Sequence, residues 1–435
     1  MLLTGALRIV TDPSDASLDT SGDLAVRDDT VSRHASPGTE VLDVSGCVVT
    51  PGLINAHHHL LQSGFRTLPG TRGVPMREWL PAMATAYAAV GIEADLTGAT
   101  AAAGVAEGLL SGVTTVADHH LNWPHDASDA DRTAIAVAVA AAARRLGSRL
   151  VFVRGSARDE PEQAARGAED VVGALLAAGH DGGVSRDGML QVAVGPAGVH
   201  SDPKETFALL REVAIKHGLR RRTQANEQVD TEIALERYGR RPLDLLEEWG
   251  WLEPGVTIAH LCDVTDAEIE RVARAGVSAT HAPGCDVPMG WGVAPVEKLR
   301  AAGIPVGLGT SGGGSNDAGH LLADARLAMQ VSALVGGPLP ARDVLAMATV
   351  GSADGLGRTD LGRLTEGSRA DVCIWDVSGV ADAGVADPVD GLLWANPGRR
   401  PRHVIVGGRV VVRDYALVTA DEHEVVAAVR ARTGR

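Results

Sequence analysis

The chain has 435 residues, of which 45% are hydrophobic and 22% are charged. A chain of this length and composition can bury a large core and needs no more than two domains. Its formal net charge of -15 opposes binding to nucleic acid or to an anionic membrane surface, because both are polyanions. It contains neither an apolar run of the roughly 20 residues that cross a bilayer nor a signal-peptide pattern. We therefore expect a cytoplasmic protein without a nucleic-acid or membrane partner.

Short runs of Val, Ile and Leu alternate along the chain with longer stretches of helical period, which is typical of repeated βα units around a parallel sheet. Helices are predicted over 133–145, 204–217, 266–275 and 296–302. The predicted strands cover residues 48–59, 113–119, 150–154, 190–196, 221–227, 256–262, 277–281 and 304–311. Eight such strands predict a (β/α)8 barrel of the TIM type.

The two ends of the chain have a different pattern. Residues 2–49 and about 370–412 are strand-like and rich in turns, and 404–410 has the pattern of a hairpin. Between these segments, 377–401 is rich in Gly, Asp and Pro and is expected to be a connector or surface loop. Both flanks are predicted to form one small β-domain. The predicted division is 1–50 for its first part, 51–364 for the barrel, and 365–435 for its second part and the C-terminal tail.

His57 and His59 form a candidate metal pair at the end of the first predicted barrel strand. Side chains two residues apart on a strand point the same way, so both imidazoles can bind one ion while His58 points elsewhere.

Other polar and ionisable residues follow the remaining predicted strands. A barrel of this type places its active site at the carboxyl ends of the strands. One histidine at a strand end is commonly structural, but several at equivalent positions indicate a site. The residues at these ends are His119, His120, His200, Gln224, Glu227, His260, His281 and Ser311.

Several motifs resemble those of the amidohydrolase superfamily, and within it the triazine hydrolases and heterocycle deaminases. They are VTPGLINAHHH at 49–59, GVTTVADHH at 112–120, IAH at 258–260, MGWGVAP at 289–295, GTSGGGSND at 309–317 and LGRLTEGSRAD at 361–371. The match runs nearly from end to end. The resemblance implies hydrolysis of a carbon-nitrogen or other leaving-group bond of a small nitrogen heterocycle, with Zn2+ as cofactor, by a homodimer.

The same resemblance implies a role for each matching residue. His57 and His59 would be the first two metal ligands, and Gln224 occupies the position of the third. Glu227 would pass a proton to the leaving group, and His260 would orient water or substrate. Ser311 stands where most members have an aspartate that binds the metal and accepts a proton. Because Glu227 is three residues beyond Gln224, it can act there only if the chain turns or bulges after the strand.

Gln224 and Ser311 leave three hypotheses open. An amide oxygen suits Ca2+ or Mg2+ better than Zn2+, and a serine supplies no carboxylate. A metal could persist with help from Gln224, Glu227 or His260. The chain could instead be a metal-depleted descendant, with metal-independent or non-hydrolytic chemistry or with small-molecule binding alone. The glutamine at position 224 could also have been introduced on purpose.

The remaining candidates concern contact with substrate. His119, His120 and Trp123 are expected either to line the pocket or to cap and pack a strand end. Met289 and Trp291 follow the seventh strand together with Cys285, where a flat heterocycle could stack on the indole. His200 is assigned to the same substrate-binding group, and His281 is expected either to contact the ligand or to close the seventh strand.

Overall fold

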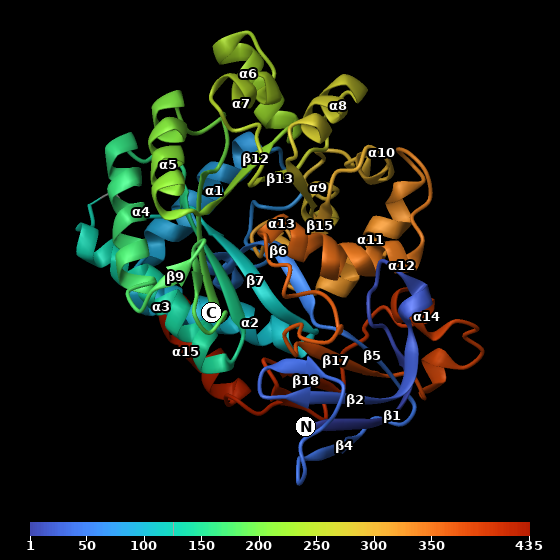
Figure 1. Ribbon diagram of the computed structural model, residues 1–435. Helices are drawn as coiled ribbons and strands as arrows, with labels where there is room; N and C mark the ends of the chain where they lie inside the picture. Colours follow the sequence, from blue (N-terminus) through green and yellow to red (C-terminus); the bar gives the residue numbers. More distant parts are fainter. Residues whose placement is uncertain (125) are drawn as a thin grey trace.

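This computed structural model describes residues 1–124 and 126–435, which form a barrel and a second, mostly antiparallel sheet (Figure 1). Parallel strands in the described ranges pair in the order β15, β14, β13, β12, β11, β8, β7, β6 and β16. Their bounds are β6 Leu53–His59, β7 Val113–His120, β8 Arg149–Ser156, β11 Leu190–Pro196, β12 Arg220–Ala225, β13 Val256–His260, β14 Ser278–His281, β15 Val306–Leu308 and β16 Ser311–Gly312. The predicted (β/α)8 fold is confirmed.

The eighth barrel strand is interrupted, and its two halves close the barrel. β15 pairs with β14, whereas β16 pairs with β6. Between the halves, the Gly309 amide donates to the carbonyl of His281 at 2.9 Å and the Thr310 amide to that of His57 at 3.1 Å. A Cβ on Gly309 would lie 2.7 Å from two atoms of His57. Only a residue without a side chain permits this close approach.

The predicted strand over 48–59 is two strands, which corrects the prediction. β5 Cys47–Pro51 belongs to the second sheet and β6 to the barrel, with Gly52 between them. A Cβ at Gly52 would lie 2.2 Å from the Thr114 hydroxyl oxygen. The glycine therefore lets the chain pass close to β7 as it leaves one sheet for the other.

The second sheet combines strands from both ends of the chain, so blue and red strands lie side by side in Figure 1. It runs in the order β20, β19, β18, β17, β5, β1, β2 and β3, and β4 also pairs with β1. The predicted hairpin is present as β18 and β19. The remaining bounds are β1 Leu2–Ile9, β2 Thr20–Arg27, β3 Thr30–Ser32, β4 Val41–Asp43, β17 Val372–Asp376, β18 His403–Val406, β19 Arg409–Arg413 and β20 Ala416–Leu417. The division at residues 50 and 364 stays a prediction.

Helices follow the barrel strands and cover its outer face (Figure 1). The main ones are α1 Met76–Val90, α2 Ala94–Leu110, α3 Asp129–Leu146, α4 Pro161–Leu175, α5 Lys204–His217, α6 Gln228–Tyr238, α7 Pro242–Glu248, α8 Asp266–Arg274, α10 Val296–Ala301, α11 Leu321–Ser332, α12 Ala341–Ala346 and α13 Ser352–Leu356. The last helix, α15 Glu422–Thr433, packs against α2. The predicted connector over 377–401 contains a helix, α14 Pro388–Trp394. No helix in the described ranges is long and apolar enough to span a bilayer.

Short strands and helical turns lie between the longer elements. The barrel edge carries β9 His180–Asp181 and β10 Val184–Ser185, and α9 Pro283–Asp286 follows β14. The 3-10 turns are η1 Ala16–Leu18, η2 Leu60–Gly64 and η4 Val380–Asp382, whereas η3 Met347–Gly351 is a π-helical turn. Local sequence explains where several helices begin. Ser128 and Asp131 form a capping box at α3, as do Thr265 and Glu268 at α8.

A buried ion pair joins the barrel to the second sheet. The Arg149 side chain donates from Nε to Asp371 Oδ2 at 2.7 Å and from Nη2 to Oδ1 at 2.9 Å. The two side chains are only 1% and 5% exposed. Asp371 also accepts from the Gly407 amide at 2.8 Å. The aspartate that ends the 361–371 motif is therefore structural here.

Asp371→Asn is expected to lower the free energy of unfolding by about 3–5 kcal/mol, because it leaves the Arg149 charge buried without its partner. Chemical denaturation measures the loss. Glu366→Gln is the control, since the Arg33–Glu366 pair is exposed and such pairs contribute at most about 1 kcal/mol. Equal losses in the two variants would contradict a structural role for the buried pair.

Candidate active site

A cavity of about 870 Å3 opens at the carboxyl ends of the barrel strands. Helix α1 forms part of its wall through Trp79, Met83 and Tyr87. The predicted site residues that line it are His59, His200, Gln224, Met289, Trp291 and Ser311. The cavity therefore lies where a barrel enzyme of this type binds its substrate.

His57 and His59 lie together on β6, and His59 lines this cavity. Both are buried, and their ring centroids are 4.9 Å apart. His59 Nδ1 donates to the carbonyl of His119 at 2.7 Å, which leaves the Nε2 lone pair free. His57 Nε2 is buried without a hydrogen-bond partner among the described residues. Burial lowers the pKa of His59 to about 4 and holds the pKa of His57 well below its usual value. Both imidazoles are therefore neutral at pH 7, the form that binds metals.

His260 is held between two acceptors at the end of β13. Its Nδ1 donates to Asp286 at 2.7 Å and its Nε2 to the Gln224 amide oxygen at 3.0 Å. The backbone at His260 is left-handed, with φ of 77°, and its ring centroid lies 5.1 Å from that of His57. Burial opposes a charge on the ring, but Asp286 and Glu227 raise the pKa of His260. Because both nitrogens face acceptors, the ring is stabilised as a cation.

Glu227 reaches His260 because the chain turns after β12. Asn226 has a left-handed φ of 56°, and Glu227 is the N-cap of α6. Glu227 Oε1 lies 3.7 Å from His260 Nε2, while Oε2 is buried without a hydrogen-bond partner in the described part of the chain. Burial raises the pKa of Glu227, against the opposing effect of His260 and His200. The turn required for this residue to act is therefore present, and its carboxyl group is suited to carry a proton.

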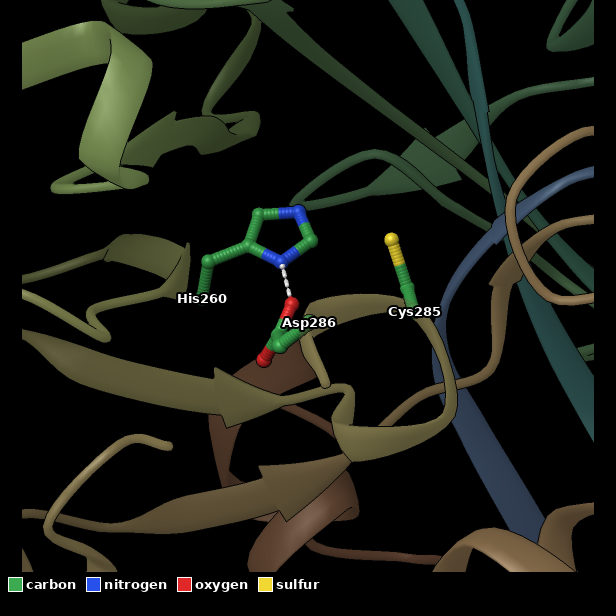
Figure 2. A group of neighbouring side chains, drawn as sticks. All are labelled: His260, Cys285 and Asp286. Atoms are coloured by element: carbon green, nitrogen blue, oxygen red, sulfur yellow. Dashed lines mark hydrogen bonds and ion pairs between the residues drawn. The ribbon is translucent and has the colours of Figure 1, made fainter. Parts of the chain in front are cut away.

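Figure 2 shows His260 with Cys285 and Asp286, whose potential ligand atoms all lie within 4.8 Å of one another. His260 Nδ1 carries the proton that it donates to Asp286, so it has no lone pair for a metal. Burial raises the pKa of the Cys285 thiol and keeps it protonated. Asp286 is therefore a hydrogen-bonded support for His260, and the three residues are not a set of metal ligands.

Apolar and polar side chains form the cavity wall. The Trp291 ring centroid lies 5.2 Å from that of His260 in an edge-to-face arrangement. Met289 belongs to the same group of buried apolar side chains as Trp291. His200 Nδ1 donates to Asp230 at 2.9 Å. Burial opposes protonation of His200, but Asp230 raises its pKa. A flat ring could therefore contact Trp291 while His200 donates a hydrogen bond to it.

Four predicted substrate contacts do not line the cavity. His119 donates from Nε2 to the Gly195 carbonyl at 3.0 Å and supports His59. His120 faces the other side of β7, where it contacts Phe152 and Trp123. Trp123 donates to the Gly155 carbonyl at 2.8 Å. His281 Nδ1 lies 3.8 Å from Asp286 Oδ2. Strand alternation puts His119 and His120 on opposite faces of β7. The hydrogen bonds and ring contacts of the four side chains are those of residues that support or pack the barrel.

Sequence reasoning missed two residues that contact the site, Asp286 beside His260 and Arg222 beneath Gln224. Asp286 gave no signal beyond its place after β14. Arg222 lies two residues before Gln224 and therefore on the same face of β12. Its Nη2 donates to the Ala56 carbonyl and, at 3.4 Å, to the Thr280 hydroxyl. Burial lowers the pKa of Arg222 to about 9. Strand alternation could have indicated this inward position.

The residues present fit a metal ion in part. His57 and His59 supply two neutral imidazoles, and the unpartnered His57 Nε2 has a lone pair or proton that nothing else in the described chain satisfies. The third position is weaker, because the Gln224 oxygen already accepts from His260. Ser311, with a left-handed φ of 54°, lines the cavity but offers a neutral hydroxyl. The donor set therefore suits a divalent ion held mainly by two histidines.

Comparisons with known proteins show which family the chain belongs to. The chain matches the amidohydrolase family over residues 48–411. It is 35% identical to 8-oxoguanine deaminase of Pseudomonas aeruginosa, over 95% of this chain and 94% of that protein. It is 32% identical to 5-methylthioadenosine/S-adenosylhomocysteine deaminase of Natronomonas pharaonis, over 97% and 93%. The crystal structure of atrazine chlorohydrolase TrzN from Arthrobacter aurescens TC1 complexed with zinc has a TM-score of 0.90, with 32% identity over 99% of both chains.

This chain belongs to the amidohydrolase family. The resemblance to triazine hydrolases and heterocycle deaminases, inferred from the motifs, is confirmed by the same comparisons.

Proposed function

We propose that the protein hydrolyses a carbon-nitrogen or comparable leaving-group bond of a small nitrogen heterocycle. One observation carries the proposal. The buried carboxyl group of Glu227 lies 3.7 Å from His260, whose ring centroid is 5.1 Å from that of His57, and His59 and Gln224 line a cavity that can hold a small molecule. A proton donor next to a candidate ion site is the arrangement that hydrolysis of an unactivated ring substituent needs.

The proposed cofactor is Zn2+, held by His57 and His59 with Gln224 as a weak third ligand. When bound, zinc would lower the pKa of a coordinated water toward neutrality and so supply hydroxide at neutral pH. The relatives support this choice, since the triazine hydrolase structure contains zinc. His119 holds the His59 ring through its carbonyl, which keeps Nε2 aimed away from the strand.

The remaining roles in the proposed reaction belong to side chains of this protein. Glu227 donates a proton to the leaving group, for which its raised pKa suits it. Asp286 holds the His260 ring, and His260 orients the reacting group. Trp291 and Met289 contact one face of the ring, and His200 donates to a polar substituent. The Ser311 hydroxyl faces the same cavity and can accept or donate a hydrogen bond there.

A panel of substrates tests the proposal. It contains 8-oxoguanine, S-adenosylhomocysteine and atrazine, the compounds that the names of the related enzymes indicate. Release of ammonia or chloride from at least one ring, abolished by removal of the metal, is expected. A zinc-loaded protein that releases neither from any of a wide set of aminopurines, aminopyrimidines and triazines would count against it.

A second candidate is a metal-depleted descendant that binds a small molecule. The observation that favours it is the hydrogen bond from His260 to the Gln224 oxygen, which occupies the group expected to complete the ion site. Elemental analysis of protein purified without chelator separates the two candidates. Bound zinc supports hydrolysis, whereas its absence together with a copurified small molecule supports the descendant.

The homodimer implied by the family resemblance and the cytoplasmic location expected from the sequence stay predictions. Sedimentation of the purified protein tests the first, and fractionation of the native cells tests the second.

A further inference from the structure

Arg222 is a buried cation that has no counterion among the described residues. Its side chain lies inside the barrel, and the residue is only 3% exposed. One guanidinium nitrogen, Nη2, contacts a backbone carbonyl and a threonine hydroxyl, both neutral groups. The other, Nη1, is buried without a hydrogen-bond partner among the described residues. No carboxylate in the described chain forms an ion pair with it, whereas buried arginines 149, 154 and 399 each have one.

This uncompensated charge lies directly beneath the histidine pair. Arg222 Nη2 contacts the carbonyl of Ala56, the residue that precedes His57. Along β12, Arg222 and Gln224 are two residues apart, which places their Cα atoms about 7 Å from each other on one face of the strand. The guanidinium is therefore one side-chain layer below the groups proposed to hold the ion.

A fixed positive charge at this depth repels a metal cation bound at His57 and His59. Coulomb interactions between charges a few ångströms apart are much stronger inside a protein than in water, and a divalent ion experiences twice the repulsion of a monovalent one. The low exposure of this layer also limits screening by salt. With a carboxylate partner the repulsion would largely cancel, but Arg222 has none in the described structure.

We propose that Arg222 sets the metal affinity of the site, lowering its affinity for divalent cations through its charge. This inference rests on the proposed ion site at His57 and His59. The weak ion binding expected of this protein then has three contributions: the neutral amide at position 224, the cation at position 222 and the protonated His260 ring, whose charge Asp286 partly balances.

The test is a zinc titration of chelator-treated protein against a competing indicator dye. Arg222→Met removes the charge and retains most of the side-chain volume, and it is expected to tighten zinc binding at least about tenfold. Arg222→Lys retains a charge and is expected to bind zinc as the parent does. Arg220→Met is the matched control, because Arg220 lies at the start of the same strand, one layer further from the histidines, and in the described chain it donates to the Gly355 carbonyl and not to a carboxylate.

Thermal unfolding without metal supplies a second readout. Removal of an uncompensated buried charge is expected to raise the melting temperature of Arg222→Met, while Arg222→Lys leaves it unchanged or lower. If the methionine variant does not fold, Arg222→Gln replaces it as the neutral variant.

The outcomes separate this inference from the proposed function. Tighter zinc binding in Arg222→Met alone among the arginine variants supports the role of the charge. Unchanged binding in Arg222→Met, with tighter binding in Gln224→His, overturns the inference and leaves the ion site standing. No zinc binding in the parent, in either variant or in their combination overturns both.

Discussion

Glu227→Gln is expected to lower kcat/KM by about 10²–10⁴ with a substrate identified from the panel, because the amide has no proton of suitable acidity to donate to the leaving group. The same change is expected to leave the melting temperature unchanged or higher. It removes a buried group whose charged form is disfavoured by burial and keeps the side-chain shape. Steady-state kinetics and thermal unfolding of the two proteins measure both effects.

Glu236→Gln is the control for this change. Glu236 lines the mouth of the same cavity but is exposed and pairs with Arg77 at 3.1 Å. A loss of no more than a few-fold is expected, since the group is remote from the cluster. If Glu227→Gln retains the parent rate, or loses rate only as much as it loses folded protein, Glu227 has no part in proton transfer.

Gln224→His is expected to raise zinc affinity by at least about tenfold. A neutral imidazole is a better zinc ligand than an amide oxygen, and a third histidine completes the ligand number common in catalytic zinc sites. The substitution also removes the acceptor that now binds His260 Nε2. The titration against a competing indicator measures the gain.

Adding His59→Asn to the Gln224→His protein tests whether the gain arises at the proposed site. The double variant should lose most of the gained affinity, because the new ligand then has only His57 as an imidazole partner. A gain that survives the loss of His59 would place the new zinc elsewhere. If the Gln224→His single variant binds zinc only as tightly as the parent, the backbone at position 224 aims its side chain away from the ion.

Much of the fold was predictable because its signals are local. Val, Ile and Leu runs mark the barrel strands, and the bounds of β11 match those predicted. The placement of His57 and His59 was predictable for the same reason, since strand alternation alone puts them on one face. The hairpin of β18 and β19 followed from strand-like residues around Gly407 and Gly408.

Other features depend on contacts between distant segments. The break at Gly52 is set by Thr114, a residue of another strand. The interruption of the eighth strand depends on pairing with both β14 and β6. The outward position of His120 follows from alternation along β7, but where that strand ends was not fixed by the sequence. Packing between segments decides these features, and a single sequence shows no such contacts.

The site residues that were not predicted are ones to which local sequence patterns assign no role. Asp286 follows β14 by five residues, and only the fold brings it to His260. Arg222 belongs to a basic run that resembles a solvent-exposed face, yet β12 turns this residue into the barrel while Arg221 pairs with Glu253 on the other side. Alternation applied to this run would have separated the two arginines.

The proposed hydrolysis requires that His57 and His59 hold a metal ion. An anomalous difference map at the zinc absorption edge, from crystals of the zinc-loaded protein, shows whether they do. A peak is expected within bonding distance of a ring nitrogen of both His57 and His59, at the end of β6. A map without a peak there, or with its peak at Cys285 and Asp286 instead, would contradict the proposal.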